Sequence, residues 1–227
     1  ADALGDLPVV ATLSPTVSST QTVVAGGQNL STTITGATSG HLVTGNWTLL
    51  RGRGFSPSED RSGSAVCIIG ETVRRALFGN SDPTGQQMRA GNVSCEVIGL
   101  LQAKGAGTFG QDQDDVVLMP IRTVQRRFLG NDNVSSISVA LAPGVSKTRG
   151  IRDIQTLMRE RRRIGLGRAI ASGRPLLRLD EPTADLDPET TAKVIALLQD
   201  TARTRLVIAA THDPALIACA KSRMVMP

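Results

Sequence analysis

Two neighbouring carboxylates and one histidine offer the most specific chemistry in this sequence. Asp180 and Glu181 end the run PLLRLDE, and His212 ends the run RLVIAATH. Both runs have the apolar character of buried strands in a parallel sheet, and ligands of such sheets bind where the strands end. One carboxylate at that edge can hold Mg²⁺ through water, and a second can orient or deprotonate an attacking water. The pattern therefore predicts a site that contains Asp180, Glu181 and His212.

A missing motif limits what this site can hold. A phosphate loop needs Gly-x-x-x-x-Gly-Lys followed by Ser or Thr, because its backbone N–H groups and its lysine cradle the phosphates. No Gly-Lys dipeptide occurs in the 227 residues. The alternative interpretation of Asp-Glu-Pro is structural, as the start of a helix after a strand.

The elements that would position these residues alternate between helix and strand. Residues 164–227 read in order as a helix (LGRAIAS), a strand (PLLRLDEP), a helix (PETTAKVIALLQDTA), a strand (RLVIAATH), a helix (PALIACAKS) and a last strand (RMVMP). Such alternation predicts a parallel sheet. We expect this part to be the less stable part of the chain, because three short strands bury only a modest core.

The first part of the chain has a different amino-acid composition. Residues 7–50 hold no Asp, Glu, Lys or Arg, and their Thr, Ser and Val favour strands, with a hairpin turn at residues 25–28. Further strands are predicted for SAVCIIG, DDVVLMP and SSISVAL, and a second hairpin is predicted for QQMRAGNVSCEVIGLL. Helices are predicted for ETVRRALFG, residues 122–129 and VSKTRGIRDIQTLMRERRR. Since these elements mix without regular alternation, residues 1–160 are predicted to form an α+β domain.

Composition and charge argue against several function classes. The chain has 25 basic and 20 acidic side chains, a net charge of +5, and only 2% aromatic residues. The aromatic platform of single-strand nucleic-acid binding cannot be assembled, and we infer no nucleic-acid partner. Two histidines far apart in sequence argue against a histidine-based metal site. No apolar run approaches the roughly 18 residues of a membrane-spanning helix, so the chain as written is expected to be soluble.

The loop at residues 104–115 gathers several acids, among them Asp112, Asp114 and Asp115. Clustered carboxylates could indicate calcium, but the loop lacks the ligand spacing and closing Glu of an EF-hand. A solvated loop is the prediction.

Residues 161–227 resemble the C-terminal part of an exporter-type ATP-binding cassette. Asp180 and Glu181 match its Walker B pair, residues 184–187 (Ala-Asp-Leu-Asp) its D-loop, and His212 its switch histidine. The resemblance implies a truncated P-loop NTPase-like fold, with Asp180 and Asp187 as nucleotide and Mg²⁺ contacts and Glu181 and His212 as catalytic residues of ATP hydrolysis. The signature serine is missing, since residues 156–160 read Thr-Leu-Met-Arg-Glu. ATP and Mg²⁺ are therefore not expected to bind this chain alone.

Residues 1–160 resemble the periplasmic core domain of MacB-type ABC permeases. The resemblance is carried by NWTLLRGRGFS (46–56), SAVCIIGETVRRALFG (64–79), GQQMRAGNVSCEVIGLL (85–101), GTFGQDQDDVVLMPIRTVQRRF (107–128) and SSISV (135–139). It implies a non-catalytic domain that contacts a periplasmic adaptor protein and other transporter chains, and that relays motion from the membrane.

Together the two resemblances conflict. They imply a bacterial inner-membrane transporter with residues 1–160 in the periplasm and residues 161–227 in the cytoplasm. The conflict indicates a join of two exporter-derived fragments at the arginine run near residue 161. In the periplasmic part, Cys67 and Cys95 lie in two predicted strands. They are either buried unpaired thiols or, if the strands are neighbours, a disulfide.

Three functions from different classes remain open. The first is a transporter interaction module with an incomplete cassette tail. The second is an ATPase subunit whose tail completes a site with a cassette on another chain. The third is a ligand-binding α+β domain unrelated to transport. The missing phosphate loop argues against independent ATPase activity, and the distributed phrases argue against the third function.

Overall fold

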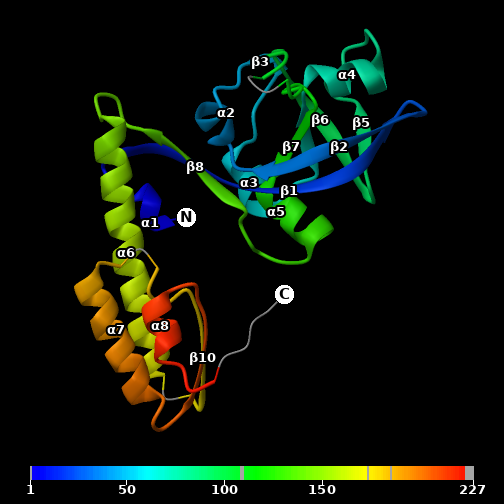
Figure 1. The fold of residues 1–227 in the computed structure, drawn as a ribbon. Helices are drawn as coiled ribbons and strands as arrows, with labels where there is room; N and C mark the ends of the chain where they lie inside the picture. Colours follow the sequence, from blue (N-terminus) through cyan, green and yellow to red (C-terminus); the bar gives the residue numbers. More distant parts are fainter. Residues whose placement is uncertain (1, 108–109, 173, 185, 223–227) are drawn as a thin grey trace. The chain divides into compact units, whose positions relative to one another are not determined.

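The computed structural model describes residues 2–107, 110–172, 174–184 and 186–222. The chain divides into two compact units between Gly150 and Ile151. This division falls within one long helix, α6 (Lys147–Ala171) (Figure 1).

A mixed sheet forms the frame of the first unit. Eight of the described strands belong to it: β1 (Val10–Ala25), β2 (Gln28–Ala37), β3 (Leu49–Gly52), β4 (Val66–Ile69), β5 (Gln87–Ala90), β6 (Val93–Leu101), β7 (Val116–Pro120) and β8 (Ser136–Leu141). Their order is β2-β7-β4-β6-β5-β1-β8, with β3 on β6. Because β1 also pairs with β2, six of the strands close into a ring. The pairs β2–β7 and β4–β6 are parallel, and the other pairs are antiparallel.

Both expected hairpins are confirmed. Residues 10–25 and 28–37 pair from Ala25 opposite Gln28, and the turn uses Gly26 and Gly27, both with positive φ. The second hairpin joins β5 to β6 with Ala90 opposite Val93. In the charge-free segment, buried Thr32 of β2 donates through its hydroxyl group to Asp115, just before β7, at 2.6 Å.

The sheet separates two apolar clusters, as alternation along its strands requires. Cys67 and Ile69 of β4 belong to the larger cluster, together with side chains of α4 (Glu71–Phe78) and α5 (Ile121–Val124). Ile68, between them, belongs to the smaller cluster with Phe55. Short helices α1 (Asp2–Gly5), α2 (His41–Thr44) and α3 (Pro57–Ser62) and the π-helical turn η1 (Gln125–Leu129) complete the unit.

Helix α4 begins where the backbone leaves no room for a side chain. A Cβ on Gly70, its N-cap residue, would collide with the carbonyl oxygen of Asp114. Val73 and Leu77 then face the core, while Glu71 accepts hydrogen bonds from Arg74 and Arg75. These arginines hold the pKa of Glu71 at about 2. The expected helix is thereby confirmed, with a glycine at its start as well as at its end.

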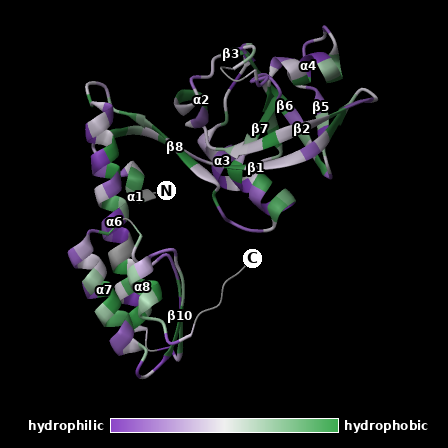
Figure 2. Cartoon of the chain, viewed as in Figure 1, coloured by the Kyte–Doolittle hydropathy of each residue, from purple (hydrophilic) through white to green (hydrophobic). Residues whose placement is uncertain are grey.

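The second unit contains most of α6, then β9 (Leu176–Asp180), α7 (Pro188–Thr201), β10 (Leu206–Ala210) and α8 (Pro214–Ala218). Strands β9 and β10 are parallel, as expected, with Leu206 opposite Leu176. Alternate residues of both strands pack with the helices in one apolar cluster, and Figure 2 shows hydrophobic residues gathered among α6, α7 and α8. The last expected strand, residues 223–227, lies outside the described residues.

Helix α6 differs from the expected pattern. Two helices were predicted on either side of residues 164–165, but the structure has one continuous helix of 25 residues. Neither Gly165 nor Gly167 interrupts it, because isolated glycines weaken a helix without ending it. The boundary predicted between residues 160 and 161 therefore lies inside a helix. Of the helices that the structure describes, none is both long enough and apolar enough to cross a membrane.

Candidate functional site

The carboxyl ends of β9 and β10 bring two of the predicted residues together. Glu181 follows β9 with a positive φ of 43°, and its N–H donates to the Ala210 carbonyl at 2.8 Å. Its carboxylate accepts from Thr211 Oγ1 at 3.0 Å and from the backbone N–H of His212 at 2.9 Å. The strand order thus fixes Glu181 against the loop that follows β10.

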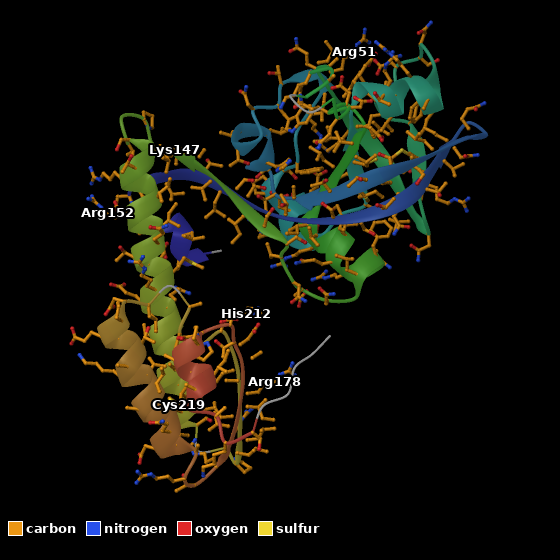
Figure 3. All side chains as sticks on the ribbon, viewed as in Figure 1. Arg51, Lys147, Arg152, Arg178, His212 and Cys219 are labelled. Atoms are coloured by element: carbon orange, nitrogen blue, oxygen red, sulfur yellow. The ribbon has the colours of Figure 1, made fainter. Side chains whose placement is uncertain are left out.

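His212 lies beside this carboxylate, with its side chain in solvent. Its Nε2 is 3.9 Å from Glu181 Oε1, while the imidazole is fully exposed (Figure 3). The backbone N–H of His212 is therefore its closer contact with Glu181, and the ring is open to solvent. In this arrangement both carboxylate oxygens of Glu181 serve as acceptors for the loop.

The other two predicted residues have separate positions. Asp180 is the last residue of β9, exposed and in register with Ala210. Asp187 caps α7, with one oxygen accepting from the Thr190 N–H at 2.9 Å and the other from the Thr190 hydroxyl at 2.7 Å. Aspartate is a favoured N-cap residue for this reason. Asp185, expected in the D-loop, lies outside the described residues.

These positions bear on the cofactors that the cassette resemblance implies. Within the described ranges, no group of three or more His, Cys, Asp or Glu side chains could hold a metal ion. The carboxylates of Glu181 and Asp187 accept hydrogen bonds from their own loops, and the sequence supplies no phosphate loop. That this chain alone binds neither ATP nor Mg²⁺ stays a prediction.

A second polar cluster, in the first unit, was not found from the sequence. Lys104 Nζ lies 3.6 Å from the ring centre of Trp47 and donates to the Gly45 carbonyl at 2.6 Å. Burial, and then the charge of Lys104, lower the pKa of nearby His41. A cation over an indole face is a stabilising contact. Nothing in the sequence pairs Trp47 with Lys104, because the fold alone brings their segments together.

Most described residues of the acidic loop are exposed, as predicted, with one exception. Asp114 is buried, and its two oxygens accept from the N–H groups of Lys104 and Gly105 at 2.8 and 2.9 Å. Asp112 accepts from the Thr72 hydroxyl, which lowers the pKa of Asp112. The acids therefore hold the loop in place through hydrogen bonds, each with its own partner.

Cys67 and Cys95 lie on neighbouring parallel strands as buried free thiols. Burial, and then the nearby Cys95 side chain, raise the pKa of the Cys67 thiol. Cys67 is in register with Val97, so Cys95 is a diagonal neighbour. The register of the two strands shifts between Cys67 and Ile68, so the spacing of an ideal sheet does not apply here. The disulfide stays a prediction.

Comparisons with known proteins agree over the first unit. The model of the "MacB-like periplasmic core domain" family matches residues 1–157. A "Macrolide export ATP-binding/permease protein MacB" from Rhodospirillum rubrum is 33% identical over 163 residues, which cover 71% of this chain and 25% of that protein. A "Pyoverdine export ATP-binding/permease protein PvdT" from Pseudomonas entomophila is 30% identical, over 70% of this chain and 24% of that protein. The chain thus spans about a quarter of the length of these curated relatives.

Solved structures show the same fold. The periplasmic region of MacB from Actinobacillus actinomycetemcomitans superposes with a TM-score of 0.62 at 20% identity, covering 70% of this chain and 71% of that one. The extracellular domain of the transporter YknZ from Gram-positive bacteria gives 0.54 at 22% identity, covering 63% of this chain and 71% of that one. At such identities the likeness concerns the fold alone.

Proposed function

The chain belongs to the MacB-like periplasmic core domain family through residues 1–157, and we propose that it works as the periplasmic part of an ABC-type efflux transporter. In this proposal the first unit binds a periplasmic adaptor protein and passes motion from the membrane to it. The observation that carries the proposal is the family match over the whole mixed sheet. Residues 1–157 accordingly derive from a periplasmic domain of an inner-membrane transporter family.

The architecture of the first unit supports a relay role. Six strands that close into a ring share their hydrogen bonds around the ring, and two apolar clusters fill the space beside them. Such a closed sheet resists bending, because deforming one strand disturbs both of its neighbours. A rigid domain can transmit a displacement from one end to the other without absorbing it.

Two exposed apolar side chains suggest where the adaptor binds. Val43 of α2 and Leu50 of β3 are 63% and 57% exposed, and they flank Trp47 in the chain. Exposed apolar side chains that gather in one patch are typical of interaction surfaces. We propose that the segment from α2 to β3 contributes to the adaptor interface.

The experiment measures binding of the full chain to a purified periplasmic adaptor of a MacB-type pump. Val43→Asp and Leu50→Asp are each expected to weaken binding about tenfold or more, since a charge would be buried in the interface. Val134→Asp introduces the same charge at another exposed position, 42% exposed, and serves as the matched control. No binding by the wild-type chain would contradict the proposed function, and equal loss in the control would contradict the proposed segment.

A second candidate function concerns residues 161–227, which we propose to be a piece of a cassette joined to the periplasmic domain. The parallel pair β9–β10, with Glu181 and His212 near each other at its end, favours this origin. In an intact transporter that piece would be cytoplasmic. It would contribute to ATP hydrolysis only with a chain that supplies a phosphate loop, because this sequence has none.

Calorimetric titration of MgATP into the full chain tests this second candidate. We expect no binding and no turnover, and Glu181→Gln should behave as the wild type does. Turnover that disappears in Glu181→Gln would show that the chain forms an ATPase site by itself. Turnover that appears only after addition of a cassette chain with a phosphate loop, and is lost with Glu181→Gln, would support the ATPase-subunit alternative.

A further inference from the structure

Residues 151–168 of α6 carry an excess of positive charge. Six arginines stand in this stretch against Asp153 and Glu160, a net charge of +4. Arg159, Arg161 and Arg168 are exposed, and the described part of the chain provides no ion-pair partner for them. Arg152 is 74% exposed (Figure 3), and it forms an ion pair with its neighbour Asp153 at 3.6 Å. The helix therefore presents a charged surface that its own unit does not neutralise.

Apolar side chains accompany these arginines. Ile151, Met158 and Ile164 are 46%, 52% and 55% exposed, and they stand in the same stretch of α6 as the arginines. Residues seven positions apart lie on one stripe of a helix, so Ile151 and Met158 share a stripe. Arg152 and Arg159 share the adjacent stripe for the same reason. Basic and apolar stripes thus run side by side along the helix.

We propose that residues 151–168 of α6 bind the surface of a membrane that contains anionic phospholipid. Arginines next to apolar side chains fit that surface, since guanidinium groups contact lipid phosphates while short apolar side chains enter the boundary between headgroups and acyl chains. Helices that lie on a membrane in this way bind through both contributions. The helix lies on the surface and does not span the bilayer.

Two other occupants of a basic helix fit the chain less well. Nucleic acid would be contacted through phosphates and stacked bases, but residues 151–168 contain no aromatic residue for stacking. An acidic protein would form ion pairs with the arginines, but it would leave the exposed side chains of Ile151 and Met158 without an apolar partner. An anionic lipid surface accounts for both stripes. Membrane is also close at hand for a domain of a transporter family.

Co-sedimentation with lipid vesicles tests the proposal on the full chain. We expect binding to vesicles made of equal parts phosphatidylglycerol and phosphatidylcholine, and little binding to phosphatidylcholine alone. The triple variant Arg152→Gln, Arg159→Gln, Arg161→Gln should bind about 100-fold more weakly, from the usual contribution of each arginine near an anionic surface. Met158→Gln should weaken binding by a smaller factor, since it removes one inserted side chain. Circular dichroism checks that each variant keeps its helix content.

A matched control separates the helix from the net charge of the chain. The variant Arg89→Gln, Arg127→Gln, Arg178→Gln removes the same charge from exposed positions on β5, η1 and β9, and should bind vesicles as the wild type does. Equal weakening in this control would overturn the proposal, because net charge alone would then explain binding. Equal binding to uncharged vesicles, or binding to an acidic protein or a nucleic acid but not to anionic vesicles, would overturn it as well.

Discussion

The substitution Asp114→Ala tests how the acidic loop is held. The buried carboxylate of Asp114 accepts hydrogen bonds from two consecutive backbone N–H groups, at Lys104 and Gly105. The same residue places its carbonyl oxygen against Gly70 at the start of α4. Removal of the carboxylate should therefore loosen the loop and its contact with α4.

The expected loss follows from the two hydrogen bonds. A hydrogen bond to a charged acceptor contributes about 1.5–3 kcal/mol, so two contribute at most about 6 kcal/mol. Lys104 and Gly105 are exposed, and water can therefore satisfy both N–H groups after the substitution. This replacement lowers the expected loss of the free energy of unfolding to about 2 kcal/mol. Asp114→Asn keeps one acceptor oxygen and should lose about half as much.

Urea unfolding monitored by tryptophan fluorescence measures this loss in the first unit. Trp47 is the single tryptophan of the chain, and Lys104, in the same loop, lies over its ring. Asp132→Ala, at an exposed position, is the control and should leave the transition within about 0.5 kcal/mol of the wild type. If Asp114→Ala matched that control, the carboxylate would not hold the loop.

Four other predictions concern the first and second units. Gly70→Ala should lower the free energy of unfolding by about 1–3 kcal/mol in the same urea assay, because the added Cβ would collide with the backbone carbonyl of Asp114. An unchanged unfolding midpoint would show that the added Cβ fits without strain. The pKa of His41 is lowered in the folded chain, so the unfolded chain takes up the proton first and stability should fall as the pH drops below about 6.5. His41→Gln should remove that slope, and a persistent slope would assign it elsewhere. The pKa of Glu59, near Arg53, is about 2 in the folded chain and about 4.5 in the unfolded chain. The contribution of Glu59 to the free energy of unfolding should therefore be present above about pH 4.5 and be lost as the pH falls toward 2. Glu59→Gln should flatten this decline. Amides of β9 and β10 should exchange with deuterium faster than those of β4, since β4 lies between two strands while Leu206 and Ile208 are exposed; equal protection would contradict the expected lower stability of the second unit.

Local signals in the sequence predicted the elements well. The turns at Gly26–Gly27 and Gly91 lie where glycine allows positive φ, and each joins two strands of the expected hairpin. The alternation of helices and strands predicted the parallel pairing of β9 and β10. This pairing brings Glu181 near His212. These features depend on residues close in sequence or on a regular repeat, which is why a pattern could reveal them.

Contacts between distant segments could not be predicted in the same way. Cys67 and Cys95 are diagonal neighbours because of the register between β4 and β6. The sequence pattern of two strands does not reveal this register, so it could not distinguish diagonal neighbours from a directly opposed pair. The buried position of Asp114 depends on its hydrogen bonds to two backbone groups of its own loop, so its charge alone suggested solvent. Helix α6 continues through the domain boundary predicted between residues 160 and 161, because the arginine run favours a helix and no cap residue ends it there.

One titration tests the central proposal most directly: a purified periplasmic adaptor of a MacB-type pump is titrated into the full chain, with and without MgATP. We predict saturable binding of the adaptor with the same affinity in both conditions, because in our proposal the first unit carries the interface and the sequence has no phosphate loop. Absence of adaptor binding, or binding that requires MgATP, would contradict it.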